Sequence, residues 1–315
     1  GLQELMLTKT DKKNISRIFA GIILYIAVMN FAQLLVTEPG LLPESLTAFF
    51  YNGNEEALGR IMLLSVLSGT AAALIYYRRM NAKYGLFEYE YTKRRKITAG
   101  ILVIGFSYTI CCQLVAGVIA NLTEVFFNSF GLTSEIDSAN FDVTGSIALA
   151  FYITLVGPFA EELIYRGFLM NGLKRYGKVY AIVVSAFIFG IMHGNLEQLP
   201  FAFLCGLMLG YAAMEYSLLC SFIMHVINNG GLSYALIFMQ RFLPEIVTGT
   251  IILFVLIGSI IVMLQVSKRY HRETADYIRE NAALKGAVPA LFNIWLLIFI
   301  IWQCIEIVLS ITPLG

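Results

Sequence analysis

The hydrophobic positions of this chain fall into nine long apolar stretches separated by short polar connections. The stretches are residues 18–36, 61–77, 97–119, 145–169, 179–193, 199–216, 218–238, 246–265 and 290–309. An α-helix needs about 20 apolar residues to cross the roughly 30 Å of hydrocarbon in a bilayer, and most of these stretches approach that length. The pattern predicts an all-α, polytopic membrane protein with about eight, between seven and nine, transmembrane helices.

The composition strengthens this prediction. Hydrophobic residues make up 58% of the 315 residues and charged residues only 14%, which excludes an ordinary soluble domain. The net charge is +1, and the basic residues form no face of the kind that binds nucleic acid. The five cysteines lie inside apolar stretches without CxxC spacing, so we interpret them as packing residues. We expect membrane lipids, and no nucleic acid, among the partners.

Charges alternate in sign between successive connections. Lysine and arginine cluster at every second connection, in residues 9–17, 78–96, 174–178 and 268–272. Acidic residues occupy the alternate connections, in residues 38–56 and 124–142. Because basic loops stay on the cytoplasmic side, we expect a cytoplasmic N-terminus. Short loops and this regular topology favour a bacterial plasma membrane.

The chain is expected to divide into three parts. Residues 1–144 hold the N-terminal transmembrane helices, 145–238 a core with unusual polar residues, and 239–315 the C-terminal transmembrane helices with a cytoplasmic connecting segment. That segment, residues 268–285, mixes charged residues with tyrosine and isoleucine, which predicts an interfacial helix.

Three ionisable residues stand inside the fourth apolar stretch: Glu161, Glu162 and Arg166. Each such residue costs about 2.5–3.5 kcal/mol at the centre of a spanning helix, so the group persists only if it pairs or takes part in chemistry. Glu162 and Arg166 are i,i+4 neighbours with the acid first, which favours a pair. Glu161 is then left as a candidate catalytic carboxylate, and Arg166, which cannot deprotonate, as an orienting partner. The alternative is a salt-bridge network that only locks the helix.

Two of the three histidines also lie inside apolar stretches. His193 ends the fifth stretch, and His225 lies in the seventh with Asn229 one helical turn later. A single histidine on an apolar helix is more often a core residue, but two of them beside a glutamate pair indicate a site. The third, His271, lies among basic residues and is expected to be solvated.

These side chains meet the needs of amide hydrolysis, which takes a base, oxyanion donors and a proton for the leaving amine. We predict that Glu161 and His193 hold and deprotonate a water. His225 and Asn229 would donate hydrogen bonds to the oxyanion. A serine mechanism at Ser221 is disfavoured, because no buried aspartate orients His225.

A metal site is the alternative chemistry. Glu161, Glu162, His193 and His225 are all legitimate zinc ligands, and their spacing across three helices does not separate a metal from a water. The HExxH pattern of zinc proteases and the GxSxG elbow of serine hydrolases are absent from the sequence. We expect either no cofactor, or a divalent metal such as zinc bound by Glu161, His193 and His225.

Three motifs in order resemble the CPBP family, the CAAX proteases and bacteriocin-processing enzymes also called the Abi family. EExxxR is present as Glu161 to Arg166, FxxxH as Phe189 to His193, and HxxxN as His225 to Asn229. The resemblance covers residues 145–234 and implies a helical core in which the motif residues converge. It also implies an intramembrane endopeptidase, of the glutamate type rather than the metallo type, in which Glu162 and Arg166 position the site.

The resemblance also indicates which substrates and partners to expect. The substrate would be a peptide or a membrane protein, and bacterial relatives process pheromones or bacteriocins, provide bacteriocin immunity or modulate membrane sensor systems. A membrane signalling partner is therefore a further expectation. The alternative is a non-proteolytic membrane scaffold or regulator that binds a partner membrane protein. A transporter would predict an inverted repeat, which the hydropathy does not show. The oligomeric state stays open.

The catalytic assignment sets one geometric condition. If the fourth and fifth helices were straight and perpendicular to the membrane, Glu161 and His193 would lie at different depths and could not share a water. We therefore expect a short or tilted fifth helix, followed by a turn submerged in the protein at residues 194–200.

Overall fold

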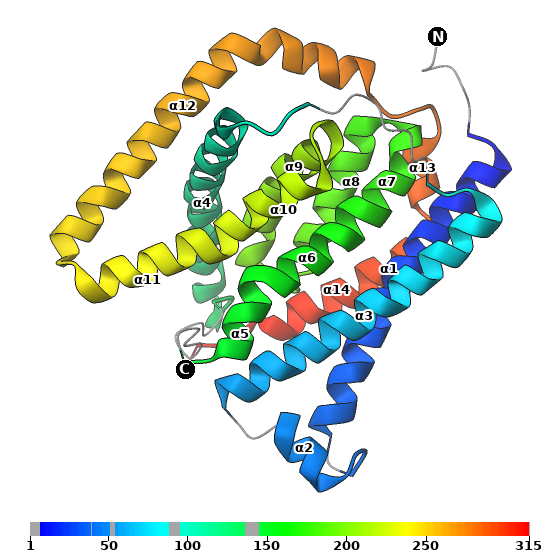
Figure 1. Cartoon of the computed structure of the whole chain (residues 1–315), viewed down its shortest axis with the longest axis horizontal. Helices are drawn as coiled ribbons and strands as arrows, with labels where there is room; N and C mark the ends of the chain where they lie inside the picture. Colours follow the sequence, from blue (N-terminus) through cyan, green and yellow to red (C-terminus); the bar gives the residue numbers. More distant parts are fainter. Residues whose placement is uncertain (1–6, 39, 51–53, 88–94, 136–144, 315) are drawn as a thin grey trace.

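The computed structural model describes residues 7–38, 40–50, 54–87, 95–135 and 145–314, and this part of the chain is almost entirely helical (Figure 1). Seven of the described helices are long and apolar enough to cross a membrane. They are α1 (Lys9–Thr37), α3 (Glu55–Tyr84), α4 (Ala99–Asn128), a composite helix over Ile147–Tyr176, α9 (Gln198–Glu215), a second composite helix over Leu218–Phe242, and α12 (Glu245–Glu280). The prediction of an all-α, multi-pass membrane protein is confirmed.

Two shorter apolar helices account for the remaining predicted stretches. They are α8 (Lys178–Ile191), with 14 residues, and α14 (Ile294–Ser310), with 17 residues. At 1.5 Å per residue α8 is only about 21 Å long, less than the roughly 30 Å of hydrocarbon in a bilayer. The fifth predicted helix is therefore short, as the condition on Glu161 and His193 requires.

The turn after α8 brings the chain back at once into α9. It spans residues 192–197, and Gly194 within it has a φ of +66°, a conformation that favours glycine. The turn ends earlier than the predicted 200, because α9 already begins at Gln198. Pro200 lies in the first turn of α9, where a proline removes no helical hydrogen bond.

Both composite helices contain π-helical turns. The first consists of α5 (Ile147–Phe151), η2 (Tyr152–Val156), α6 (Gly157–Glu161), η3 (Glu162–Met170), α7 (Asn171–Leu173) and η4 (Lys174–Tyr176). The second consists of α10 (Leu218–Val226), η5 (Ile227–Leu232) and α11 (Ser233–Phe242). The π-helical parts are η2, η3 and η5. Such turns often accompany functional sites, and here they occur in the two helices that carry the acidic pair and the HxxxN motif.

Most helices pack around one large apolar core, and a smaller apolar cluster lies between α9 and α10. α1 lies against α3, and α8 lies against α9. Tyr77 of α3 donates a hydrogen bond to the carbonyl oxygen of Ile18 in α1 at 2.8 Å, and a side chain at Gly21 would overlap its ring. Ile164 and Leu169 of η3 are fully buried in the same core. The helix that carries the acidic pair is therefore held firmly by its apolar face.

The helix α12 stands at the edge of the bundle and packs against α4. It runs without a break to Glu280, and residues 281–286 are not helical. The separate interfacial helix predicted over 268–285 is thus wrong in its limits. Figure 1 shows the last turns of α12 crossing the end of the bundle, where Tyr277 donates a hydrogen bond to Glu215 of α9 at 2.7 Å.

Small elements complete the described chain. They are α2 (Glu44–Phe50), α13 (Ala287–Leu291) and an antiparallel pair of two-residue strands, β1 (Leu132–Thr133) and β2 (Thr312–Pro313). Residues 88–94 and 136–144, which carry part of the predicted charge pattern and the boundary after residue 144, lie outside the described residues. The division into three parts stays a prediction.

Candidate active site

The acidic pair spans the boundary between α6 and η3, and Glu162 is its buried member. Its side chain is 1% exposed, and its Oε1 is 2.9 Å from Nη1 of the fully buried Arg166. Arg166 also donates through Nη2 to the carbonyl oxygen of Gly206 at 3.3 Å, and its guanidinium lies 4.5 Å from the centre of the Phe189 ring. The i,i+4 ion pair expected from the sequence is present and buried, and Nε of Arg166 is a buried donor that has no hydrogen-bond partner among the described residues.

His225 joins this ion pair from α10. Its Nδ1 lies 2.9 Å from Oε1 of Glu162, and its Nε2 lies 3.5 Å from Oε2 of Glu161. A carboxylate only accepts hydrogen bonds, so Nδ1 carries a proton. Ser221, one turn earlier on the same helix, donates to Oε2 of Glu162. Both oxygens of Glu162 are thus engaged, and this carboxylate anchors its neighbours.

Glu161 has the opposite environment. Its side chain is 25% exposed, against 1% for Glu162. It lines a cavity of about 90 Å³. Glu161 is therefore the carboxylate of the pair that can meet a water or a substrate.

His193 lies in the turn after α8. Its Nδ1 is 2.9 Å from the carbonyl oxygen of Phe189, which can only accept, so the neutral ring presents the lone pair of Nε2 elsewhere. The ring of Phe189 packs edge-on against both histidines, with centroid distances of 5.1 Å to His193 and 5.8 Å to His225. Phe189, the first residue of the second motif, thus sets the spacing of the two imidazoles.

Asn229 is placed by the π-helical segment η5. Its Nδ2 donates to the carbonyl oxygen of Ile153 at 3.4 Å, and its Oδ1 accepts from Asn228 at 2.8 Å. A side chain at Gly230 would overlap Thr154, so η5 lies directly against η2. The π-helical turns of the two composite helices therefore meet beside Asn229, whose amide keeps a second N–H for another acceptor.

One cavity joins four of the six predicted residues. Glu161, His193, His225 and Asn229 all line the space of about 90 Å³. Thr109 of α4 and apolar side chains of α9 form other walls. A polar cavity of this size has room for water. Glu162 and Arg166 do not line the cavity, but they contact residues that do: Glu162 binds His225, and the Arg166 guanidinium packs on the ring of Phe189.

Three residues contribute to this site in roles that were not predicted, although Ser221 was considered as a nucleophile. Ser221 binds Glu162, Gly206 accepts from Arg166, and Thr109 lines the cavity. The i,i+4 spacing of Ser221 and His225 was a usable signal, because it puts both residues on one helical face. The other two carried no signal, since their role depends on how α4 and α9 pack.

The ligands expected for a metal ion, Glu161, His193 and His225, line the same cavity. In the described part of the chain no group of three His, Cys, Asp or Glu side chains is placed to hold one. Glu162, a legitimate zinc ligand by type, has both oxygens engaged by Arg166, His225 and Ser221.

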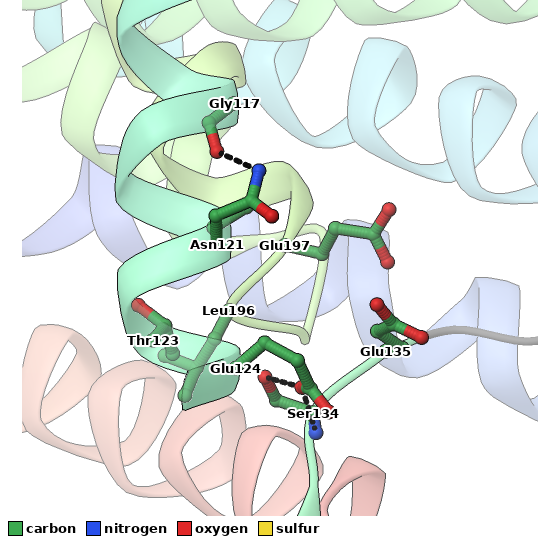
Figure 2. A pocket seen from close by; sticks show the side chains of 9 residues that line it. Gly117, Asn121, Thr123, Glu124, Ser134, Glu135, Leu196 and Glu197 are labelled. Carbon is green, nitrogen blue, oxygen red and sulfur yellow. Dashed lines mark hydrogen bonds between the residues drawn. The ribbon is translucent and has the colours of Figure 1, made fainter. Parts of the chain in front are cut away.

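A larger cavity, of about 230 Å³, lies at the far end of α4 (Figure 2). It is lined by Gly117, Ala120, Asn121, Thr123, Glu124, Ser134, Glu135, Leu196 and Glu197. Glu124 accepts hydrogen bonds from the backbone N–H and the hydroxyl of Ser134 at 2.9 and 3.0 Å. This lining offers carboxylates and one amide but no histidine. It lacks the combination of base and oxyanion donors that hydrolysis needs, although the cavity is larger.

Comparison with known proteins agrees with the motifs. Residues 143–231, which include all six predicted site residues, match the family of type II CAAX prenyl endopeptidases described as Rce1-like. The resemblance predicted from the sequence is thereby confirmed. No solved structure matches the chain.

Two curated proteins are similar to the chain. The putative membrane peptidase YdiL of Bacillus subtilis (strain 168) is 31% identical over 99 residues, which cover 31% of this chain and 39% of YdiL. The membrane-embedded CAAX protease MroQ of Staphylococcus aureus (strain USA300) is 25% identical over 206 residues, which cover 61% of this chain and 80% of MroQ. The match to YdiL therefore spans well under half of that relative.

Proposed function

We propose, from the premise that residues 143–231 form an Rce1-like segment, that this multi-pass membrane protein is an intramembrane endopeptidase of the CAAX protease type. The observation that carries the proposal is that Glu161, His193, His225 and Asn229 line one cavity between apolar helices. The printed names of two relatives, a membrane peptidase and a membrane-embedded protease, support the same class of reaction.

Glu161 is the base in this mechanism. It faces the cavity, whereas three donors already engage Glu162. A water in the cavity donates one hydrogen bond to Glu161 and one to the Nε2 lone pair of His193. Glu161 takes a proton as the water attacks the carbonyl carbon, and then returns it to the amine when the carbon–nitrogen bond breaks. Glu161 is then a carboxylate again, and the protein has regained its initial protonation state.

His225 and Asn229 stabilise the oxyanion that forms in the attack. Asn229 uses the second N–H of its amide. The Nδ1–H of His225 is bound to Glu162, so Nε2 donates only when the ring carries both protons. The charges of Glu161, Glu162, Arg166 and His225 then sum to zero, which suits a cluster inside a membrane.

The substrate is a peptide or protein held in the same membrane. We place the enzyme in a bacterial plasma membrane with its N-terminus in the cytoplasm, because its basic connections alternate with acidic ones and the two relatives come from bacteria. Processing of a pheromone or bacteriocin, bacteriocin immunity and control of a membrane sensor are the roles that this activity would serve.

The test uses the full-length protein in liposomes with solubilised bacterial membrane proteins as the substrate pool. New peptide termini are counted by mass spectrometry for wild type, Glu161→Gln and His193→Ala, with Glu135→Gln in the larger cavity as the matched control. We expect new termini with wild type and Glu135→Gln and none with the other two variants. Identical termini with all four proteins would leave a non-proteolytic scaffold instead. Loss in a chelator that added zinc restores would replace the water mechanism by a metal mechanism.

A further inference from the structure

A buried serine outside the three motifs is bound to the candidate site. Ser221 of α10 is 0% exposed and lies one helical turn before His225. Its hydroxyl donates to Oε2 of Glu162 and lies 2.9 Å from the carbonyl oxygen of Leu209 in α9. A hydroxyl has a single proton, and a carboxylate is the stronger acceptor of the two. The proton therefore goes to Glu162, and Ser221 ties α10 to η3.

The donors around Glu162 are shared unevenly between its two oxygens. Arg166 Nη1 and His225 Nδ1 each lie 2.9 Å from Oε1, whereas Ser221 contacts Oε2. Contacts on one oxygen alone would let the carboxylate swing about that oxygen while it keeps both partners. The bond from Ser221 fixes the second oxygen and with it the plane of the group. Because Nδ1 of His225 is bound to this carboxylate, that plane sets the direction in which Nε2 points.

The geometry does not place Ser221 as a nucleophile. A serine nucleophile must reach the substrate carbonyl while a neighbouring base takes its proton. Ser221 is fully buried, it is not among the residues that line the cavity, and its proton is directed to a carboxylate rather than to an imidazole nitrogen.

We propose that Ser221 is a positioning residue whose hydroxyl holds the Glu162 carboxylate in the orientation that directs Nε2 of His225 towards the oxyanion. The inference rests on the proposed endopeptidase function and deepens it. Ser221 acts only through Glu162 and His225, so its loss affects the transition state more than substrate binding.

The test compares Ser221→Ala with Ser185→Ala in the full-length protein in liposomes. Ser185 is a matched control, since it is also 0% exposed and its hydroxyl donates to a backbone carbonyl, that of Tyr165, at 2.8 Å. Each variant loses one buried hydrogen bond, and we expect the larger loss of thermal stability for Ser221→Ala, because its acceptor is a carboxylate rather than a carbonyl. The probe is the peptide that wild type cuts fastest in the membrane-protein pool. Ser221→Ala should lower kcat about 10- to 100-fold with little change in KM, and Ser185→Ala should keep the wild-type kcat.

A second readout does not depend on catalysis. Diethyl pyrocarbonate modifies accessible imidazoles, and mass spectrometry follows the rate at His225 and His193 separately. Ser221→Ala should change the rate at His225 only, and Ser185→Ala should change neither rate. Equal effects of the two serine variants on kcat and on His225 would overturn the proposal. If wild type cuts no peptide, the endopeptidase function fails, and the modification rate at His225 alone decides the role of Ser221.

Discussion

The two sides of the candidate site differ sharply, although adjacent residues build them. On the closed side, Glu162 is 1% exposed and Arg166, His225 and Ser221 engage its carboxylate. On the open side, Glu161 is 25% exposed, lines the cavity and lies 3.5 Å from Nε2 of His225. One residue of helix, about 100° of rotation, separates the two carboxylates.

This difference assigns different tasks to two chemically identical groups. A carboxylate with three donors cannot take a proton without giving up part of an ion pair, so Glu162 holds geometry. A carboxylate that reaches a cavity can take a proton from water, so Glu161 is suited to chemistry. Loss of the counter-charge of Glu162 on the closed side should therefore cost stability first, whereas loss of a side chain that lines the cavity on the open side should cost rate first.

The largest effect on stability is expected from Arg166→Met. The variant leaves Glu162 buried without its counter-charge, which should lower the free energy of unfolding by about 3–5 kcal/mol. Unfolding in mixed detergent measures the change. The matched control is Arg279→Met, which removes an ion pair of 2.7 Å to Asp276 whose side chains are 75% and 54% exposed, and it should change little. Equal losses in the two variants would show that the buried ion pair contributes no more to stability than the exposed one.

A large effect on rate, with little on stability, is expected from Asn229→Ala. Removal of one oxyanion donor typically lowers kcat about 10²- to 10³-fold. Cleavage of the probe peptide in liposomes measures it. Asn121→Ala is the control, because Asn121 lines the larger cavity and, among the described residues, donates only to the carbonyl oxygen of Gly117 in its own helix. A rate loss for Asn121→Ala as large as that for Asn229→Ala would contradict the assignment of catalysis to the cavity that Glu161 lines.

The smallest effect is expected from Gly194→Ala in the turn that carries His193. The φ of +66° is strained for alanine, and the new Cβ would lie 3.3 Å from Cβ of Glu306 in α14. We expect a loss of about 1–2 kcal/mol in stability together with a lower cleavage rate, because His193 shifts with the turn. Gly258→Ala is the control, since a Cβ there meets nothing within 4 Å. Full activity of Gly194→Ala would show that the open side tolerates displacement of His193.

The helices were predictable because hydropathy is a local property. Each of the nine apolar stretches is mostly helical, although the ninth is interrupted at residues 292–293 between α13 and α14. The chemical requirement that Glu161 and His193 meet predicted the short α8. The end of α12 was not predictable from charge. No glycine or proline interrupts residues 259–280, so the basic cluster at 268–272 shows only where polar surroundings begin and not where the helix stops.

The residues that form the site were predictable, but most of the contacts between them were not. Motif spacing places Glu162 beside Arg166 and His225 beside Asn229 within single helices. Ser221 binds a carboxylate 59 residues away, a contact that only tertiary packing creates. The π-helical turns at η2, η3 and η5 shift the register of the helices, and hydropathy carries no trace of that shift.

We propose that Glu161 is the carboxylate that reacts with water and that Glu162 is the carboxylate that holds the site together. The most direct test of this proposal is carbodiimide modification of the full-length protein in liposomes, with both glutamates followed by mass spectrometry and cleavage of the probe peptide measured alongside. We expect Glu161 to be modified much faster than Glu162, and activity to fall in step with the modification of Glu161. Equal modification of the two residues, or full activity after Glu161 has reacted, would contradict the proposal.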